Sequence, residues 1–283
     1  MIKGLALTPP AVGRITIGKV VERNGKRLPE KDDEFTLTSQ VQTRDGWVLH
    51  PLNDTLRGQL RGKTKVTKAN STPAKTDENA EPAPTEPIEA IQAHIKLRSI
   101  PVKLLFDDPD LNLRAHFTLF DRLTGRPMCV GNGESCKRAG IQGAETLECE
   151  GPDLCGYAQG NCKPYGRMNV HVGDEDELGT FVFRTTGFNS IRTLSTRLRY
   201  FAAVSGGMLS TLPLELRLRG KSTVKSHRAA IYYVDLTLRS GMNMVEALTC
   251  AKFDREVRLG AGWDQAALDT AAREGFAAGV FEE

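Results

Sequence analysis

The segment that decides the fold is "CVGNGESCKRAGIQGAETLECEGPDLCGYAQGNCKPYGR", Cys129 to Arg167, which holds five of the six cysteines of the chain. Such a cluster forms disulfide bonds, serves a reaction or binds a metal. The chain has 283 residues and is long enough to bury a hydrophobic core without covalent cross-links. The cysteines therefore need another explanation than a disulfide framework.

The compartment of the protein bears directly on the cysteines. The N-terminal residues, "MIKGLALTPPAVGR", contain no apolar run of signal-peptide length. No other segment approaches the roughly 20 apolar residues that cross a membrane. The sequence predicts a cytoplasmic protein, and in that compartment a cysteine cluster is more often metal-binding or catalytic than disulfide-bonded.

The cluster has the composition of a metal site. "CVGNGESC" and "CGYAQGNC" are loops of equal length with internal glycines, so each can return two sulfurs to one point. No CxxC pair is present, and the spacing of a standard zinc finger is therefore absent. We expect four thiolates around one Zn²⁺, with an iron–sulfur cluster and unliganded thiols as alternatives. The candidate metal ligands are Cys129, Cys136, Cys149, Cys155 and Cys162; the favoured set leaves out Cys149, which otherwise replaces Cys129.

Charge and catalysis complete the prediction for this segment. Lys137, Arg138 and Lys163 directly follow cysteines and would offset the negative charge of a thiolate-rich site. Cys250, in a helical pattern, is expected to be a buried apolar residue. The five histidines show no motif relation to a cysteine, and neither GxxxxGK[ST] nor GxSxG occurs. We therefore expect the protein not to be an enzyme.

The rest of the chain predicts an α+β fold: a mainly antiparallel β core with an inserted Cys-rich zinc knuckle and C-terminal helices. Residues 1–62 read as a β-rich segment with short strand patterns. Residues 63–88 carry four prolines and no aromatic residue, leucine or isoleucine up to Pro87, which predicts a flexible linker. Residues 89–240 are expected to form the α+β core, with the knuckle at 129–162, and residues 241–283 a helical segment.

Basic residues are concentrated in one part of the chain. The formal net charge is only +3, from 38 basic and 35 acidic residues. The segment from 184 to 228 nevertheless contains a single acid, Glu215. Such a segment suits phosphate or an acidic protein surface, and solvated outer faces are the alternative. The candidate nucleic-acid or partner-binding residues are Arg184, Arg192, Arg197, Arg199, Arg217, Arg219, Lys221, Lys225 and Arg228.

Three stretches resemble the signatures of one protein family. They are "GLALTPPAVGRITIGKVVERNGKRLPEKDDEF" at 4–35, "CKPYGRMNV…ELGTFVFRTTGFNS" at 162–190, and "GGMLSTLPLELRLRGKS…YYVDLTLRSG" at 206–241. Together they resemble the recombination directionality factor-like proteins of phages and integrative or conjugative elements, the partners of large serine integrases. The resemblance leaves out the linker and the C-terminal segment.

The resemblance implies a non-enzymatic regulator of site-specific DNA recombination that binds an element-encoded integrase or another recombination protein. It implies no membrane partner. Relatives of this type also occur in plasmids and conjugative elements beside replication and annealing genes. The alternative is therefore a zinc-containing nucleic-acid-binding accessory of mobile-element replication, recombination or defence, with DNA or RNA as the ligand.

Overall fold

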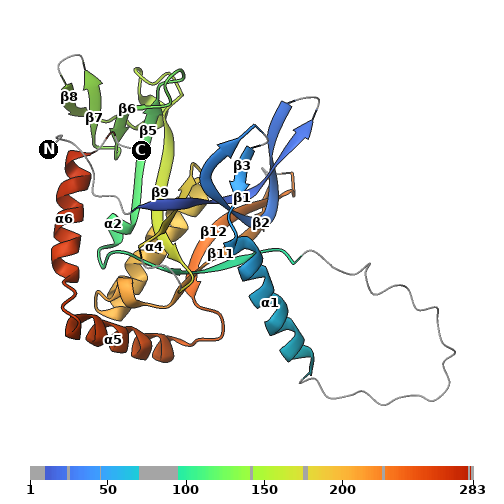
Figure 1. Ribbon diagram of the computed structural model, residues 1–283. Coiled ribbons are helices and arrows are strands. Elements are labelled where there is room, and N and C mark those ends of the chain that lie inside the picture. The colour runs from blue at the N-terminus through green and yellow to red at the C-terminus, as the bar shows by residue number, and fades with distance from the viewer. Residues whose placement is uncertain are drawn as a thin grey trace.

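The computed structural model describes residues 10–23, 26–44, 46–69, 95–140, 143–174, 178–224, 227–279 and 281 (Figure 1). The strands are β1 (Ala11–Arg23), β2 (Lys26–Thr43), β3 (Gly46–Leu49), β4 (Ser99–Lys103), β5 (Leu113–Phe120), β6 (Pro127–Gly131), β7 (Ser135–Gly140), β8 (Gly143–Glu148), β9 (Lys163–Val172), β10 (Thr180–Thr185), β11 (Leu214–Ser222) and β12 (Ala230–Leu238). The helices are α1 (Leu52–Ala69), α2 (Pro109–Asn112), α3 (Gly151–Leu154), α4 (Phe188–Ser205), α5 (Met244–Gly260) and α6 (Gln265–Ala278), with a 3-10 turn at Leu209–Thr211.

The described strands form one branched, mainly antiparallel sheet. Its main path runs β3-β2-β1-β10-β9-β5-β6-β7-β8, and a branch leaves β9 through β4 to β11 and β12. Only the pairing of β1 with β10 is parallel among the described strands. The branch arises because the first part of β9 pairs with β5, whereas its end pairs with β4. The predicted α+β class, with a mainly antiparallel sheet and C-terminal helices, is confirmed.

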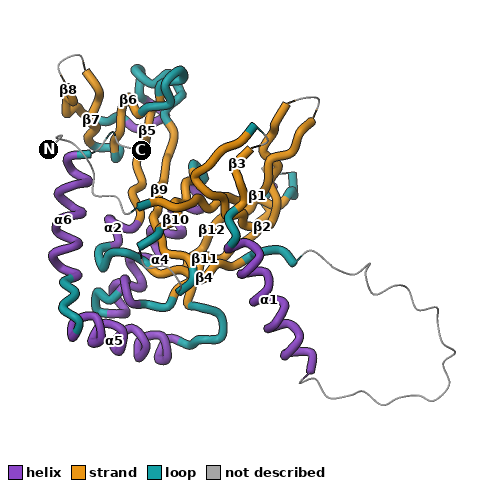
Figure 2. The backbone as a smooth tube through the Cα atoms, viewed as in Figure 1, coloured by secondary structure: helices purple, strands orange, loops and turns teal. Residues whose placement is uncertain are grey.

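The main hydrophobic core lies between this sheet and α4. Leu194 and Leu198, one helical turn apart on α4, are fully buried. They belong to the same cluster as Met168 and Val170 of β9 and Leu216 of β11. A smaller cluster of Phe106, Leu111 and Ala272 fastens α6 beside the sheet. Figure 2 shows α6 along the left side of the molecule and α5 along its lower edge.

The helix α1 extends into the predicted linker. Leu52, Leu56 and Leu60 recur every four residues along α1 and pack on the main core. Residues 63–69, the start of the predicted linker at 63–88, are the last part of this helix. Lysine and alanine support helix, and residues 63–72 contain no proline. Residues 70–94 lie outside the described residues. No helix in the described part of the chain is both long and apolar enough to cross a membrane.

The cysteine segment is an outlying part of the sheet. β6, β7 and β8 form an antiparallel meander, and a loop with α3 returns the chain to β9. Neither hydrophobic cluster takes a member from the described residues between His116 and Cys162. The buried apolar side chains of this segment, Leu119, Val130, Cys136 and Ala158, therefore lie apart from both clusters.

Candidate functional sites

Three cysteines lie on one face of the β6–β8 meander. Gly131 on β6 pairs with Cys136 on β7, and Cys136 pairs in turn with Leu147 on β8. Side chains two residues apart on a strand point to the same face. Cys129 therefore shares the face of Gly131, and Cys149 follows on the face of Leu147. The register alone brings together cysteines that are far apart in sequence.

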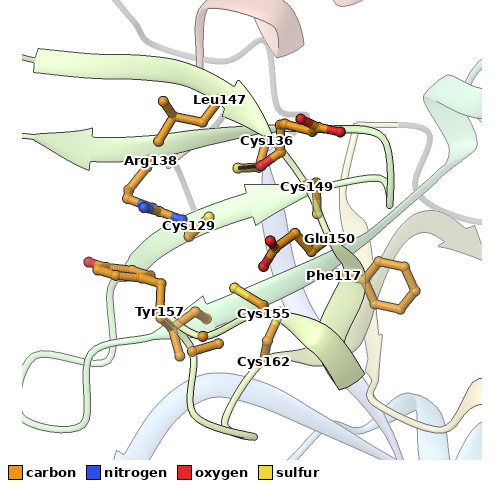
Figure 3. A pocket seen from close by; sticks show the side chains of 16 residues that line it. Phe117, Cys129, Cys136, Arg138, Leu147, Cys149, Glu150, Cys155, Tyr157 and Cys162 are labelled. Atoms are coloured by element: carbon orange, nitrogen blue, oxygen red, sulfur yellow. Dashed lines mark hydrogen bonds between the residues drawn. The ribbon is translucent and has the colours of Figure 1, made fainter.

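The loop after the meander adds the other two cysteines. Cys155 ends α3, where its backbone N–H donates to the Gly151 carbonyl at 3.2 Å, and Cys162 directly precedes β9. All five cysteines line one cavity of about 340 Å³, as Figure 3 shows. Phe117 of β5 forms part of its wall. The structure therefore brings together the complete set of predicted cysteine ligands.

Gly131 makes the close packing of the cluster possible. A Cβ atom at this position would lie 2.7 Å from the Cβ of Cys136 and 2.8 Å from the Sγ of Cys149. Real Cβ atoms essentially never approach other atoms so closely. Gly131 therefore provides the space in which the side chains of Cys136 and Cys149 pack.

The cysteines differ in burial and in their electrostatic surroundings. All are free thiols; Cys136 is buried, and the other four are half-buried against the cavity. Burial raises the pKa of Cys136 to about 11, with Cys129 and Cys149 acting in the same direction. Burial also raises the pKa of Cys162 to about 11, and Cys129, Cys155 and Cys149 add to the shift.

One of the three predicted cationic neighbours faces the cluster. The Arg138 guanidinium lies 3.8 Å from the centre of the Tyr157 ring, and Arg138 is paired with Cys129 in the register of β6 and β7. Figure 3 shows it between these two side chains. Lys137 points the other way, because its Nζ donates to the Ala277 carbonyl of α6 at 3.2 Å. Lys163 is exposed at the start of β9.

The cysteine side chains surround the cavity without meeting at one point. Within the described residues, no group of three or more His, Cys, Asp or Glu side chains has a metal-binding arrangement. The structure therefore shows the cysteine cluster but not the predicted zinc knuckle. Cys250 is exposed on α5, and the prediction that it is buried was wrong. The side chains of α5 that pack on the main core are Ala251, Met244 and Leu248, and Cys250 lies on another side of the helix.

The predicted basic residues lie on β10, α4, β11 and the turn before β12. Arg197 of α4 and Arg219 of β11 both pair with the buried Asp235 carboxylate, at 3.0 and 3.2 Å. Arg217 pairs with Glu215 and also donates to the Ser240 hydroxyl at 2.8 Å. These guanidiniums neutralise buried carboxylates, which are costly to leave unpaired.

The other predicted basic residues do not pair with a buried carboxylate in the described part of the chain, and several are exposed. Arg199 pairs with Asp110 at 3.3 Å across an exposed contact, and Lys221 donates to the Asn189 amide oxygen at 2.8 Å. Arg184 is half-buried on β10. Within the described residues, no carboxylate lies within ion-pair distance of the exposed side chains of Arg192 and Arg228. Lys225 lies outside the described residues.

A second cavity, of about 470 Å³, lies on the opposite face of β5, between the sheet and α6. Arg114, His116 and Phe120 line it from β5, whereas Phe117 and Leu119 face the cysteines. The Arg114 guanidinium lies 4.3 Å from the ring centre of Phe276 on α6. The sequence analysis did not identify this cavity, although the alternation along β5 carries its signal.

The comparisons with known proteins give one positive result. The family described as Gp3-like, recombination directionality factor-like, matches residues 12–239. Neither the curated proteins nor the solved structures gave a significant match. The matched range begins in β1 and extends just past β12, so it includes the sheet, the cysteine cluster and the basic residues.

Proposed function

The chain belongs to the recombination directionality factor-like family, and from this membership we propose that it regulates site-specific DNA recombination by binding a recombinase. In this proposal the protein is not an enzyme, and its partner is an integrase encoded by the same phage or other mobile element. The observation that carries the proposal is the family match over residues 12–239, which spans almost the whole described sheet.

A factor of this kind acts through differential binding. A ligand shifts a conformational equilibrium only if it binds one state more tightly than the other, and equal affinity for both states shifts nothing. The factor must therefore prefer the arrangement of the recombinase that is competent for excision. No catalytic group is required of the factor in such a mechanism.

The pairing of the arginines supports a protein partner over direct phosphate contacts. Arg197, Arg217 and Arg219 are each held by a buried carboxylate of β11 or β12. A phosphate group would have to compete with these carboxylates, and the buried acid would then lose its partner. Three guanidiniums are thus fixed by two carboxylates, and an ordered surface with a small positive excess suits complementary contacts with another folded protein.

An in vitro recombination assay tests the proposal. The integrase of the same element is incubated with each pair of attachment sites, with and without the full-length chain. The protein should promote excision and suppress integration, and it should be captured by the immobilised integrase. If folded protein leaves the direction and extent of both reactions unchanged, the directionality role is rejected.

The alternative is a zinc-containing nucleic-acid-binding accessory of mobile-element replication, recombination or defence. The exposed arginines Arg192 and Arg228 favour it, since they are available for phosphate. Direct phosphate contacts make binding fall steeply with salt, whereas association through a protein partner does not follow the same slope. Titration of labelled DNA and RNA with the isolated protein at several salt concentrations separates the two functions.

A further inference from the structure

We propose that the second cavity, between the sheet and α6, binds a nucleoside monophosphate, either free or as the phosphorylated end of a single nucleic-acid strand. The basic end of the cavity holds the phosphate, and the aromatic end holds the base. The inference does not rest on the proposed binding to a recombinase, because it concerns a small ligand of the isolated chain. The helix α6, which forms one wall, lies beyond the residues that match the family.

The cavity has the dimensions of a small-molecule site. Its volume is about 470 Å³, within the roughly 300–1,000 Å³ of ligand pockets. Alternate side chains of β5 form one wall, and α2 and α6 contribute to the others. The ligand is therefore a small molecule or the end of a chain, not the broad surface of a folded partner.

Three arginines from three elements meet at one end of the cavity. Arg114 of β5 and Arg167 of β9 are directly opposite in the register, so their Cβ atoms are about 5 Å apart. Arg273 of α6 lines the same cavity and is fixed by Asp108 at 2.8 Å. Among the described lining residues the only acids are Asp108 and Asp110, so the three arginines leave a positive excess.

The chemistry of this end suits a phosphate. Arg167 is 8% exposed, and the Arg114 guanidinium packs on the Phe276 ring. Charges act more strongly on a ligand where the protein excludes bulk water. A phosphomonoester carries about −1.5 to −2 charges at pH 7, and its oxygens accept the paired N–H donors of several guanidiniums. A carboxylate carries one charge and satisfies fewer of them.

The pair of arginines continues as a row across three strands. Arg184 of β10 is opposite Arg167 on the side away from Arg114. Asn169 lies two residues beyond Arg167 on the same face of β9. The Nε atom of Arg184 and the amide nitrogen of Asn169 are buried, and neither has a hydrogen-bond partner within the described residues. Buried donors are ordinarily satisfied, so this face has donors to spare for an anion beside Arg167.

Aromatic side chains form the other end of the cavity. Phe120 is the last residue of β5, and its ring packs edge-to-face on Tyr165 of β9, with the ring centroids 5.0 Å apart. Pro127 and Val130 of β6 extend this apolar surface. Nucleobases stack on aromatic side chains of this kind, whatever the base. A basic end and an aromatic end on one strand match the phosphate and the base of a nucleotide.

His116 lies between the two ends, opposite Tyr165 in the register. It is open to the cavity, but the surrounding protein still desolvates it, which lowers its pKa, and the Arg114 charge acts in the same direction. A neutral imidazole has one donor and one acceptor. His116 is therefore suited to hydrogen-bond to the sugar or the base edge of the ligand.

Isothermal titration calorimetry of the wild-type, full-length chain tests the site without any variant. The probes are adenosine monophosphate, adenosine and inorganic phosphate at constant ionic strength. The monophosphate should bind at least about 10-fold more tightly than either adenosine or phosphate, because only it fills both ends. Failure of the monophosphate to bind overturns the proposal. Equal affinity for adenosine, or equal affinity for phosphate, also overturns it.

Oligonucleotides identify the source of the nucleotide. A short single strand with a 5′-phosphate should bind more tightly than the same strand without it. If the phosphorylated strand also binds more tightly than adenosine monophosphate, the ligand is a strand end; if it binds less tightly, the ligand is the free nucleotide. Equal affinity of the two strands, both above that of the monophosphate, would place nucleic acid elsewhere on the surface and contradict the proposal.

Substitutions at the two ends locate the ligand. Arg114→Gln should weaken binding of the monophosphate by about 10–100-fold and leave adenosine binding nearly unchanged. Phe120→Leu should weaken both by roughly 5- to 150-fold, the loss of one stacked base. Arg258→Gln on α5, outside the cavity, removes the same charge and should bind as the wild type does. Equal losses in Arg114→Gln and Arg258→Gln, with thermal unfolding showing both folded, would reveal a general effect of net charge and overturn the site.

Discussion

A Cβ atom on Gly131 would lie 2.8 Å from the Sγ of Cys149, so these two residues fit together only because position 131 has no side chain. Gly131 lies on β6, whereas Cys149 follows β8, two strands away in the meander. The close approach therefore requires a residue without a side chain at position 131, beside the cysteine cavity. A glycine in a strand interior is weakening in itself, and here close packing explains its presence.

Substitution Gly131→Ala should destabilise the cysteine segment. The new methyl group would also lie 2.7 Å from the Cβ of Cys136, so the strands must move apart. We expect a loss of about 1–3 kcal/mol in the free energy of unfolding, as for other overpacked sites. Urea unfolding measures the loss, and protease cleavage between residues 129 and 162 locates it.

Gly156→Ala is the matched control, because a Cβ at Gly156 meets no atom within 4 Å. It lies in the same segment and should leave the stability within about 0.5 kcal/mol of the wild type. Equal loss in both variants would show that the segment is sensitive to any added methyl group.

The shared carboxylate of Asp235 should be a major contributor to stability. Its side chain is 5% exposed, and it pairs with both Arg197 and Arg219. Asp235→Asn removes the negative charge that pairs with the two guanidiniums, which are nearly half exposed and keep part of their hydration. We expect a loss of about 1–3 kcal/mol in denaturant unfolding.

Asp110→Asn serves as the control for the buried pair. Asp110 is 78% exposed and pairs with Arg199, which is 68% exposed. Exposed pairs contribute about 0–1 kcal/mol, so this variant should unfold close to the wild type. If both substitutions cost the same, burial of the carboxylate is not what makes the Asp235 contacts important.

Much of the fold could be predicted from the sequence, because apolar residues recur at helical or strand spacing wherever an element has a buried face. Ile191, Leu194, Leu198 and Phe201 recur at helical spacing in the sequence, and in α4 all four are buried. In contrast, the six residues of β8, "GAETLE", are all exposed and show no alternation of apolar and polar side chains. This strand exists because it pairs with β7, and pairing is not visible in the local sequence.

The sequence predicted which residues belong to the candidate sites, but not how the folded chain places them relative to one another. Cysteine clustering identified the five thiols, whereas the register that places Cys136 beside Gly131 is a property of the assembled sheet. Likewise, counting arginines indicated a basic surface. The acids that pair with them, Asp235 and Asp110, lie outside the basic segment at 184–228, so this segment alone does not reveal the ion pairs.

Asp269 should make the attachment of α6 depend on pH. Burial raises the pKa of Asp269, and the nearby Asp107 carboxylate acts in the same direction, while the Gln265 amide opposes it. Arg273 is a further charged neighbour. A carboxyl whose pKa is raised by folding stabilises the protein below its ordinary value near 3.8, and this contribution is lost as the pH rises through the folded pKa.

Unfolding of wild-type protein and Asp269→Asn should therefore be compared between about pH 4 and pH 7. The variant has no carboxyl to titrate, so the wild type should lose stability relative to it as the pH rises. Two parallel stability curves would contradict the raised pKa. The comparison of two proteins at each pH removes the contributions of other titrating groups.

Any direct binding of DNA should depend on Arg192 and Arg228 more than on the paired arginines. Within the described residues these two exposed side chains have no carboxylate partner, so phosphate contact costs no existing ion pair. Arg192→Ala or Arg228→Ala should lower the slope of log affinity against log salt by about one unit. Arg217→Ala, which removes the partner of the buried Glu215, should instead lower stability and leave the slope nearly unchanged. Fluorescence anisotropy of a labelled duplex at several salt concentrations measures the slope, and thermal unfolding of each variant measures stability. An equal drop in slope for Arg217→Ala would mean that phosphate displaces the Glu215 carboxylate, and the arginines of β11 would then belong to a nucleic-acid surface.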